Sequence, residues 1–343
     1  MTADAVGGIW AYASELADAL EARGDEVVRA AIGPQSPPAS DPVAWREGLL
    51  EWQDDPWADL EATGEWLLGL ADEVRPDVVH LNSYALAALP WQRPTVVVGH
   101  SCVASWHEHA RGEPAGRAWD RYRDEISRGL DAADAVVAPT AAMLADLRRL
   151  YGLPDDAGRV IHNGVAAPAE PPVPKEPFVL GAGRLWDEAK GLEALDRAAA
   201  SVAWPVQVAG DAGGGGAKNA ELVGVLARDE LRERMGRAAV FAHPARYEPF
   251  GLVVLEAAQA ECALVLGDIA TLRELWDGAA LFVPPGDAEA LAAAIDRLAS
   301  DAAVRETLAA AARERAQRHD AARMAREYAH LYESLRARTG AAA

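Results

Sequence analysis

The chain has 343 residues, half of them hydrophobic and a quarter charged, which is typical of a globular protein long enough for two domains. Its formal net charge of −20 at pH 7 argues against nucleic acid, or an anionic membrane surface, as the main partner. Cys102 and Cys262 lack metal-ligand spacing, and no stretch reaches the roughly 18 consecutive apolar residues of a membrane span. We therefore expect a cytoplasmic protein without a metal site or stable membrane binding.

Short apolar strands alternate with helical patterns along the first half of the chain. Residues 10–24 predict an amphipathic helix that ends at Gly24, and residues 119–133 and 140–152 predict two more, the last capped by Thr140. The predicted strands lie at residues 25–32, 76–82, 94–100, 134–139 and 158–165. This alternation indicates an α/β fold with parallel strands, in a first domain over residues 1–165.

The start of this domain is unusual, because a doubly wound domain should open with a strand and only six residues precede the Gly7-Gly8 turn. We therefore expect the first strand to be missing. Three explanations stay open: a start codon assigned too far downstream, a truncated chain, or a strand that is simply short. The first two together are favoured, and mass spectrometry of the native N-terminus would test them.

Residues 166–177 carry five prolines and predict a linker between two similar doubly wound halves. After this linker the alternation restarts, in a second domain over residues 178–320. Its predicted strands lie at residues 178–185, 205–211, 221–226, 239–245, 263–268 and 279–285. Three helices close the chain, at residues 287–301, 302–318 and 321–338.

Common nucleotide motifs do not fit. Residues 181–186 follow a strand, but Trp186 stands where a dinucleotide fingerprint needs its third glycine. The chain has no phosphate loop, nucleophile elbow or zinc-binding helix motif. Residues 210–218 contain four consecutive glycines and predict a flexible loop, with a phosphate cradle as the alternative.

Two cations mark the end of the first strand of the second domain. Arg184 ends this strand and Lys190 follows where the next helix is expected to begin. Cations at a helix N-terminus suit a diphosphate, because the unpaired N–H groups and the helix dipole add to their charge. The alternative is a surface pair that forms ordinary salt bridges with Asp187 and Glu188.

Two glutamates flank a Pro-Phe-Gly turn in residues 246–261. Glu248 precedes a helix N-terminus and Glu256 lies in that helix among apolar neighbours, so its charge needs partners. Carboxylates accept hydrogen bonds only, so each could hold vicinal hydroxyl groups of a ligand. The alternative is an acid that favours the helix dipole together with one salt-bridged glutamate.

Residues 246–257, RYEPFGLVVLEA, resemble the E-x7-E motif of retaining nucleotide-sugar glycosyltransferases, in particular glycosyltransferase family 4. Residues 183–191, GRLWDEAKG, resemble the Arg–Lys diphosphate clamp of that family, and residues 6–27 resemble its Gly-Gly loop and first helix. The resemblance covers essentially the whole chain. It implies the GT-B fold, in which two Rossmann-like domains face each other across a cleft and the final helix returns to the first domain.

The resemblance also implies roles for single residues. Arg184 and Lys190 would bind the diphosphate, Glu248 the donor-sugar hydroxyls and Glu256 the ribose hydroxyls. His100 would touch the sugar, with a buried strand-end histidine as the alternative. The remaining implied donor contacts come from the glycine turn, the base pocket and the second motif: Gly7, Gly8, Val225, Leu226, Pro249, Phe250, Gly251 and Leu252.

The implied activity is metal-independent transfer of a hexose from a UDP- or GDP-sugar to a hydroxyl acceptor, with retention and without a cofactor. The acceptor is expected to be soluble. Tryptophans in the first domain favour a carbohydrate acceptor, and packing in the core is the alternative role of these side chains. A same-fold sugar-nucleotide epimerase and an inactive nucleotide-sugar-binding protein are the competing functions.

Overall fold

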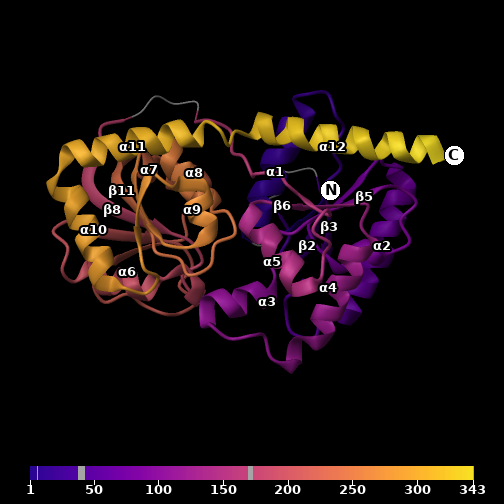
Figure 1. Ribbon diagram of the computed structural model, residues 1–343, viewed down its shortest axis with the longest axis horizontal. Coiled ribbons are helices and arrows are strands. Elements are labelled where there is room, and N and C mark those ends of the chain that lie inside the picture. The colour runs from indigo at the N-terminus through magenta and orange to yellow at the C-terminus, as the bar shows by residue number, and fades with distance from the viewer. Residues whose placement is uncertain (6, 38–42, 169–172, 343) are drawn as a thin grey trace. The chain divides into compact units, whose positions relative to one another are not determined.

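The computed structural model describes residues 1–5, 7–37, 43–168 and 173–342. The chain forms two compact units, of which unit 1 comprises Met1–Gly164 and Ala321–Ala343 and unit 2 comprises Val165–Asp320 (Figure 1). Parallel sheets with helices build both units, so the predicted α/β class is confirmed. Part of the predicted linker, residues 169–172, lies outside the described residues, and the first strand of unit 2 begins within the linker range, at Glu176.

Unit 1 contains two parallel sheets that meet between β1 and β4. The N–H of Asn82, just after β4, donates to Thr2 Oγ1 at 2.8 Å, and its Nδ2 donates to Thr2 O at 2.5 Å. The strands therefore follow the order β3-β2-β1-β4-β5-β6-β7, which is that of a doubly wound domain. They are β1 (Thr2–Asp4), β2 (Ala30–Gly33), β3 (Ala44–Glu47), β4 (Val79–Leu81), β5 (Thr95–Val98), β6 (Ala135–Ala138) and β7 (Arg159–Val160).

The expectation of a missing first strand is wrong. Residues Thr2–Asp4 form β1, which is buried and pairs in parallel with β2 in the register Thr2↔Ala30 to Asp4↔Ile32. Three residues are too few for a period-two pattern to be recognised in a sequence. A short strand was the explanation against which the other two together were favoured.

The helices of unit 1 include one long helix that the sequence analysis did not predict, α2, together with the strand β3 before it. Thr140 caps α5 as predicted, because its side chain accepts from the N–H of Met143 at 3.1 Å. The final helix, α12, packs against α1 within this unit. The helices are α1 (Gly8–Glu21), α2 (Trp57–Val74), α3 (Val103–Trp106), α4 (Asp120–Ala132), α5 (Ala141–Tyr151) and α12 (Ala321–Ala342), with the short turns η1 (Ala85–Ala88), η2 (His107–Arg111) and η3 (Arg117–Trp119).

Tryptophans of unit 1 serve mainly as packing residues. Several lie against the hydrophobic clusters on the faces of its sheets: Trp52, Trp57, Trp66, Trp91 and Trp119. Trp45 is 40% exposed. Core packing, which was the alternative to a sugar-binding role, therefore accounts for most of these side chains.

Helix α4 approaches the turn η1 so closely that only glycine fits at position 129. A Cβ atom there would lie 2.0 Å from the carbonyl oxygen of Tyr84. We expect Gly129→Ala to destabilise the protein by about 1–3 kcal/mol, because helix and turn must separate to admit the methyl group. Gly69→Ala, in α2 where a Cβ meets nothing within 4 Å, is the matched control and should stabilise by about 0.5–1 kcal/mol. Urea unfolding measures both, and equal effects would contradict this account.

Unit 2 is a single six-stranded parallel sheet in the order β10-β9-β8-β11-β12-β13, with β8 and β11 at its centre. Counted from β8, this order is the 3-2-1-4-5-6 of a Rossmann-type domain. The strands are β8 (Glu176–Ala182), β9 (Val206–Ala209), β10 (Glu221–Gly224), β11 (Ala238–His243), β12 (Ala263–Gly267) and β13 (Ala280–Val283).

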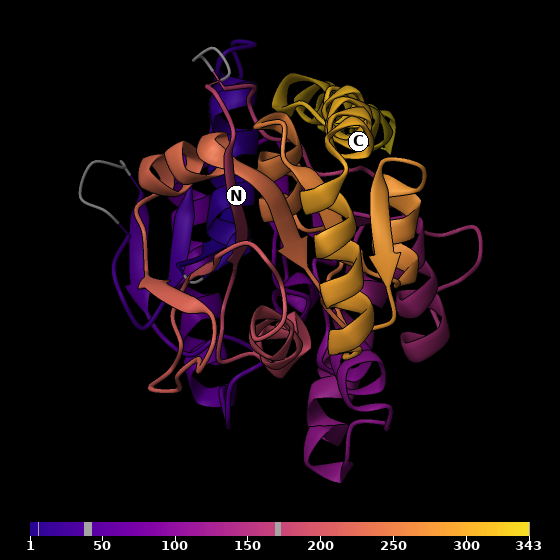
Figure 2. The same ribbon diagram turned by 90° about the vertical axis from the view of Figure 1, so that its left-hand side faces the viewer.

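Helices cover both faces of this sheet (Figure 2). Alternate residues of β8 point to opposite faces: Phe178 and Leu180 join one core cluster and Val179 joins the other. One face carries α7 (Arg228–Arg237), α8 (Leu252–Gln259), α9 (Ala270–Trp276) and α11 (Ala302–Ala316). The other carries α6 (Leu192–Ala199) and α10 (Ala288–Ser300).

Candidate functional site

The loops that follow β8 and β11 lock together at the carboxyl ends of these two central strands, where doubly wound domains bind their ligands. The N–H of Arg246 donates to Ala189 O at 2.8 Å. Gly191 has φ 71°, and a Cβ atom on it would lie 2.4 Å from Pro244 O, so this close approach requires glycine. The two motifs singled out in the sequence thus form one site in unit 2.

Glu248 lies at the centre of this site. Lys190 Nζ and His243 Nε2 both lie 3.0 Å from its Oε2 atom, and all three side chains are largely buried. Burial alone would raise the pKa of Glu248. The charge of Lys190 and the hydrogen bond from His243 outweigh burial and hold this pKa well below its usual range. Glu248 is therefore a carboxylate at neutral pH, able to accept hydrogen bonds but not to donate a proton.

The side chain of Arg184 has different partners from the side chain of Lys190. Its Nη2 lies 3.4 Å from Asp187 Oδ2, and its guanidinium lies 5.4 Å from the ring centre of Trp186. The salt bridge to Asp187 is the alternative that the sequence analysis left open for this arginine. Its side chain is 42% exposed, so a ligand can still reach it. The helix expected at Lys190 begins two residues later, since α6 starts at Leu192 after the 3₁₀ turn η4 (Glu188–Lys190).

The turn between Glu248 and α8 presents its backbone. Gly251 has φ 83°, and a Cβ atom there would come within 3.2 Å of Glu248 Cγ, so glycine lets the chain turn beside the carboxylate. Within the described part of the chain, the N–H groups of Gly251 and Leu252 have no acceptor. Pro249 and Phe250 are buried, with the Phe250 ring in the core, so this turn offers backbone rather than side chains. Such a helix N-terminus can accept an anion.

Glu256 is a salt-bridged helix glutamate. Its Oε1 atom lies 3.0 Å from Arg228 Nη2 and 3.4 Å from Arg232 Nη2, and both arginines belong to α7. This pairing supplies the partners that the sequence analysis required, and it is the arrangement of the alternative interpretation. The Glu256 side chain is 13% exposed.

The segment between β10 and α7 carries the residues predicted to meet a nucleobase. Val225 is 75% exposed, whereas Leu226 packs against the core. The nearby glycine-rich segment is a loop, as predicted, and a Cβ atom on Gly213 would lie 2.8 Å from Cβ of Trp186. The end of this loop is fixed, because Asp196 Oδ1 accepts from three consecutive N–H groups at residues 218–220.

Unit 1 holds the other predicted residues. Gly7 precedes α1 with φ 80°, and Gly8 begins this helix; both are exposed. His100 follows β5, packs edge-on against Tyr12 at 4.4 Å, and its burial lowers its pKa to about 3. Its Nε2 lies 2.8 Å from Asn82 Oδ1. Since Asn82 Nδ2 already donates to a carbonyl, this oxygen can only accept, so His100 is neutral and carries its proton on Nε2.

Four residues of these sites escaped the sequence analysis: His243, Asn82, Arg228 and Arg232. Asn82 ends a predicted strand and His243 lies two residues before the end of another, which was a usable signal, since ligand-binding residues gather at strand ends. The arginines gave no such signal. Their role depends on α7 packing beside α8.

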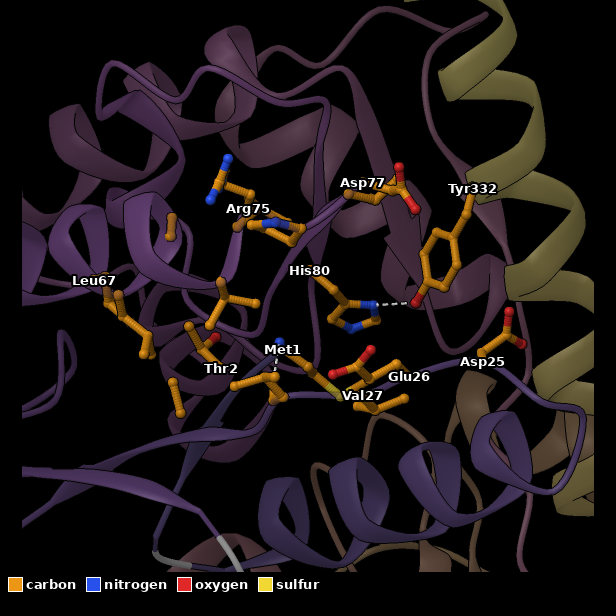
Figure 3. Close-up of a pocket in the computed structure, with 18 of the residues that line it drawn as sticks. Met1, Thr2, Asp25, Glu26, Val27, Leu67, Arg75, Asp77, His80 and Tyr332 are labelled. Atoms are coloured by element: carbon orange, nitrogen blue, oxygen red, sulfur yellow. Dashed lines mark hydrogen bonds between the residues drawn. The ribbon is translucent and has the colours of Figure 1, made fainter.

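A pocket of about 320 Å³ lies in unit 1 (Figure 3), at the amino ends of β1, β2 and β4. His80 lines it and lies 2.7 Å through Nδ1 from the hydroxyl of Tyr332. Burial lowers the pKa of His80 well below its ordinary value. This burial indicates a structural role for His80, and none of the predicted donor-site residues lines the pocket.

Among the described residues no helix combines the length and apolar character needed to cross a membrane. Comparison with known proteins identifies the family. Residues 6–167 match the family described as Glycosyltransferase Family 4, and residues 168–315 match Glycosyl transferases group 1. The chain is also 27% identical over 369 residues to a glycogen synthase of Mycobacterium tuberculosis, covering 90% of this chain and 86% of that protein. The two models together identify the chain as a glycosyltransferase.

Solved structures show the fold of this glycosyltransferase. A sucrose-phosphate synthase from Thermosynechococcus elongatus superposes with a TM-score of 0.80 at 22% identity, covering 97% of this chain and 94% of that chain. HepE from Anabaena, solved in complex with UDP-glucose, gives 0.75 at 20% identity over 96% and 97%. The fold is GT-B, as the resemblance implied. The glycosyltransferase is thus an enzyme with a GT-B fold that is similar in sequence to a glycogen synthase.

Proposed function

We propose that this glycosyltransferase moves a hexose from a UDP-sugar, or failing that a GDP-sugar, to a hydroxyl group of a carbohydrate acceptor, with retention. The arrangement of Lys190, His243 and Glu248 in unit 2 carries the proposal, because it sets an ammonium group beside a carboxylate that only accepts hydrogen bonds. Two similar proteins support the donor and acceptor classes: HepE was solved with UDP-glucose, and one relative from Mycobacterium tuberculosis is a glycogen synthase.

Breaking a sugar–phosphate bond places negative charge on the departing diphosphate. Arg184, Lys190 and the N–H groups at the start of α8 would stabilise this charge, and no metal takes that role in the proposal. Glu248 would accept from donor-sugar hydroxyls and Glu256 from the ribose. Val225 and Leu226 would meet the base.

Three residues of unit 1 also have roles in the proposal. Gly7 and Gly8 would let phosphate or acceptor approach the backbone, since neither carries a side chain. His100 would accept a sugar hydroxyl through Nδ1, the ring nitrogen that has no proton and no protein partner among the described residues. Glu248 and Glu256 are assigned to hydroxyl binding, so they do not form the acid–base pair of a glycosidase.

A panel of UDP- and GDP-sugars, each with and without carbohydrate acceptors, tests the proposal. We expect nucleotide diphosphate release that depends on the acceptor, and an NMR coupling constant of the product that shows retention at the anomeric carbon. An epimerised donor without release would indicate an epimerase. Binding without turnover would indicate an inactive binding protein, and either result would overturn the proposal.

A further inference from the structure

The two oxygen atoms of Glu248 have different surroundings. Oε2 receives both Lys190 Nζ and His243 Nε2, each at 3.0 Å. Oε1 has no partner among the described residues. The backbone is also held, because Thr271 Oγ1 donates to the carbonyl oxygen of Glu248 at 2.6 Å. The carboxylate is therefore fixed through one oxygen and open at the other.

His243 is well placed to provide this fixation. It is the last residue of β11, its side chain is 3% exposed, and its ring stacks nearly parallel to Phe241 at 6.4 Å. A carboxylate cannot donate, so the proton in this hydrogen bond belongs to His243 Nε2. A buried, stacked ring on a central strand loses little freedom when it forms the bond, so it holds the carboxylate more precisely than a flexible side chain does.

Lys190 by itself would be a poorer anchor. Its ammonium group has three donors: one is directed to Glu248, and a weaker one to Tyr247 O at 3.4 Å. The proposed function also requires this ammonium group to stabilise the negative charge that develops on the departing diphosphate. A second donor on Oε2 keeps the carboxylate in place while Lys190 interacts with phosphate.

We propose that His243 is the positioning residue of the donor-sugar site, holding Glu248 Oε2 so that Oε1 alone accepts one hydroxyl group of the hexose. This inference rests on the proposed function and deepens it. His243 touches Glu248 rather than the donor. It thereby contributes to the choice of donor sugar, because an oxygen in a fixed position favours a hydroxyl in one position on the ring.

Two substitutions separate positioning from folding. His243→Leu removes the donor, whereas His243→Gln keeps an N–H group near the place of Nε2. By calorimetry we expect His243→Leu to weaken binding of UDP-glucose by about tenfold or more and to leave binding of UDP unchanged. His243→Gln should restore most of the affinity. Should His243→Leu not fold, His243→Asn is compared with His243→Gln, because its shorter amide does not reach Glu248.

Deoxy donors sharpen the test, since a purely structural role would not depend on them. A UDP-deoxyglucose that lacks the hydroxyl bound by Oε1 should bind equally well to the wild type and to His243→Leu, while the other deoxy donors keep the difference. Equal weakening of UDP and UDP-glucose, or no weakening of either, would overturn the positioning role. If the wild type binds neither UDP-sugars nor GDP-sugars, the proposed function itself fails. If the donor is a GDP-sugar, the probes are GDP, that GDP-sugar and its deoxy derivatives.

Discussion

Replacing Lys190 with alanine should lower kcat at saturating donor by about 10² or more. This substitution removes the more firmly fixed of the two cations that would stabilise the departing diphosphate. Lys190 is 12% exposed and is directed by Glu248, so its charge is held in place before the donor arrives. A group that is fixed and partly shielded from water stabilises developing charge better than a mobile surface lysine. Steady-state kinetics at saturating donor and acceptor measures the change.

Lys218→Ala is the matched control for this experiment. Lys218 is exposed at the end of the glycine-rich loop. Among the described residues it forms a hydrogen bond only through its backbone N–H, which donates to Asp196. Its loss should leave kcat unchanged. If Lys190→Ala raised only the KM for donor and left kcat intact, Lys190 would bind the ground state and the leaving-group role would be wrong.

Asp4→Asn should stabilise the protein at neutral pH. Asp4 ends β1 and is 5% exposed; burial, together with the charge of Glu51, raises its pKa to about 8, against an opposing hydrogen bond from Trp52. Burial likewise raises the pKa of Glu51 to about 7, although the N–H groups of Ala85 and Tyr84 oppose the shift.

The direction of the pH dependence follows from these shifts. Between about pH 4 and pH 8 the folded protein keeps a proton on Asp4 that the unfolded chain has released, so stability falls as pH rises through this window. At about 1.4 kcal/mol per pKa unit, the cost near pH 7 is on the order of 4 kcal/mol. Asparagine resembles the protonated acid and carries no such cost.

Urea unfolding at about pH 5 and about pH 8 measures this effect. The wild type should lose stability between the two conditions, and Asp4→Asn should lose distinctly less. Asp124→Asn, at an exposed position in α4, is the control and should follow the wild type. A stability that rises from the lower to the higher pH, with no benefit from Asp4→Asn, would show that this carboxyl group is ionised in the folded protein.

Much of the arrangement of the candidate site was predictable because its signals are local. Glycine, arginine, lysine and glutamate stand at fixed spacings after apolar strands, and ligands of doubly wound domains gather at strand ends. The partners of these residues were not predictable. No signal in the sequence near His243 shows that the Glu248 side chain will turn back toward this histidine. Nor does a local signal show that the same carboxylate oxygen of Glu248 will contact Lys190, which lies 58 residues from Glu248 in sequence.

Sequence by itself determined the α/β class, most strands and helices, the family and the chemistry of the motif residues, since periodicity and residue type are properties of short segments. Tertiary structure decided the rest. It placed β8 beside β11, set Arg228 and Arg232 against Glu256, and formed β1 from only three residues through pairing with β2. These outcomes depend on which strands and helices become neighbours, and contacts between segments far apart in the chain settle that choice.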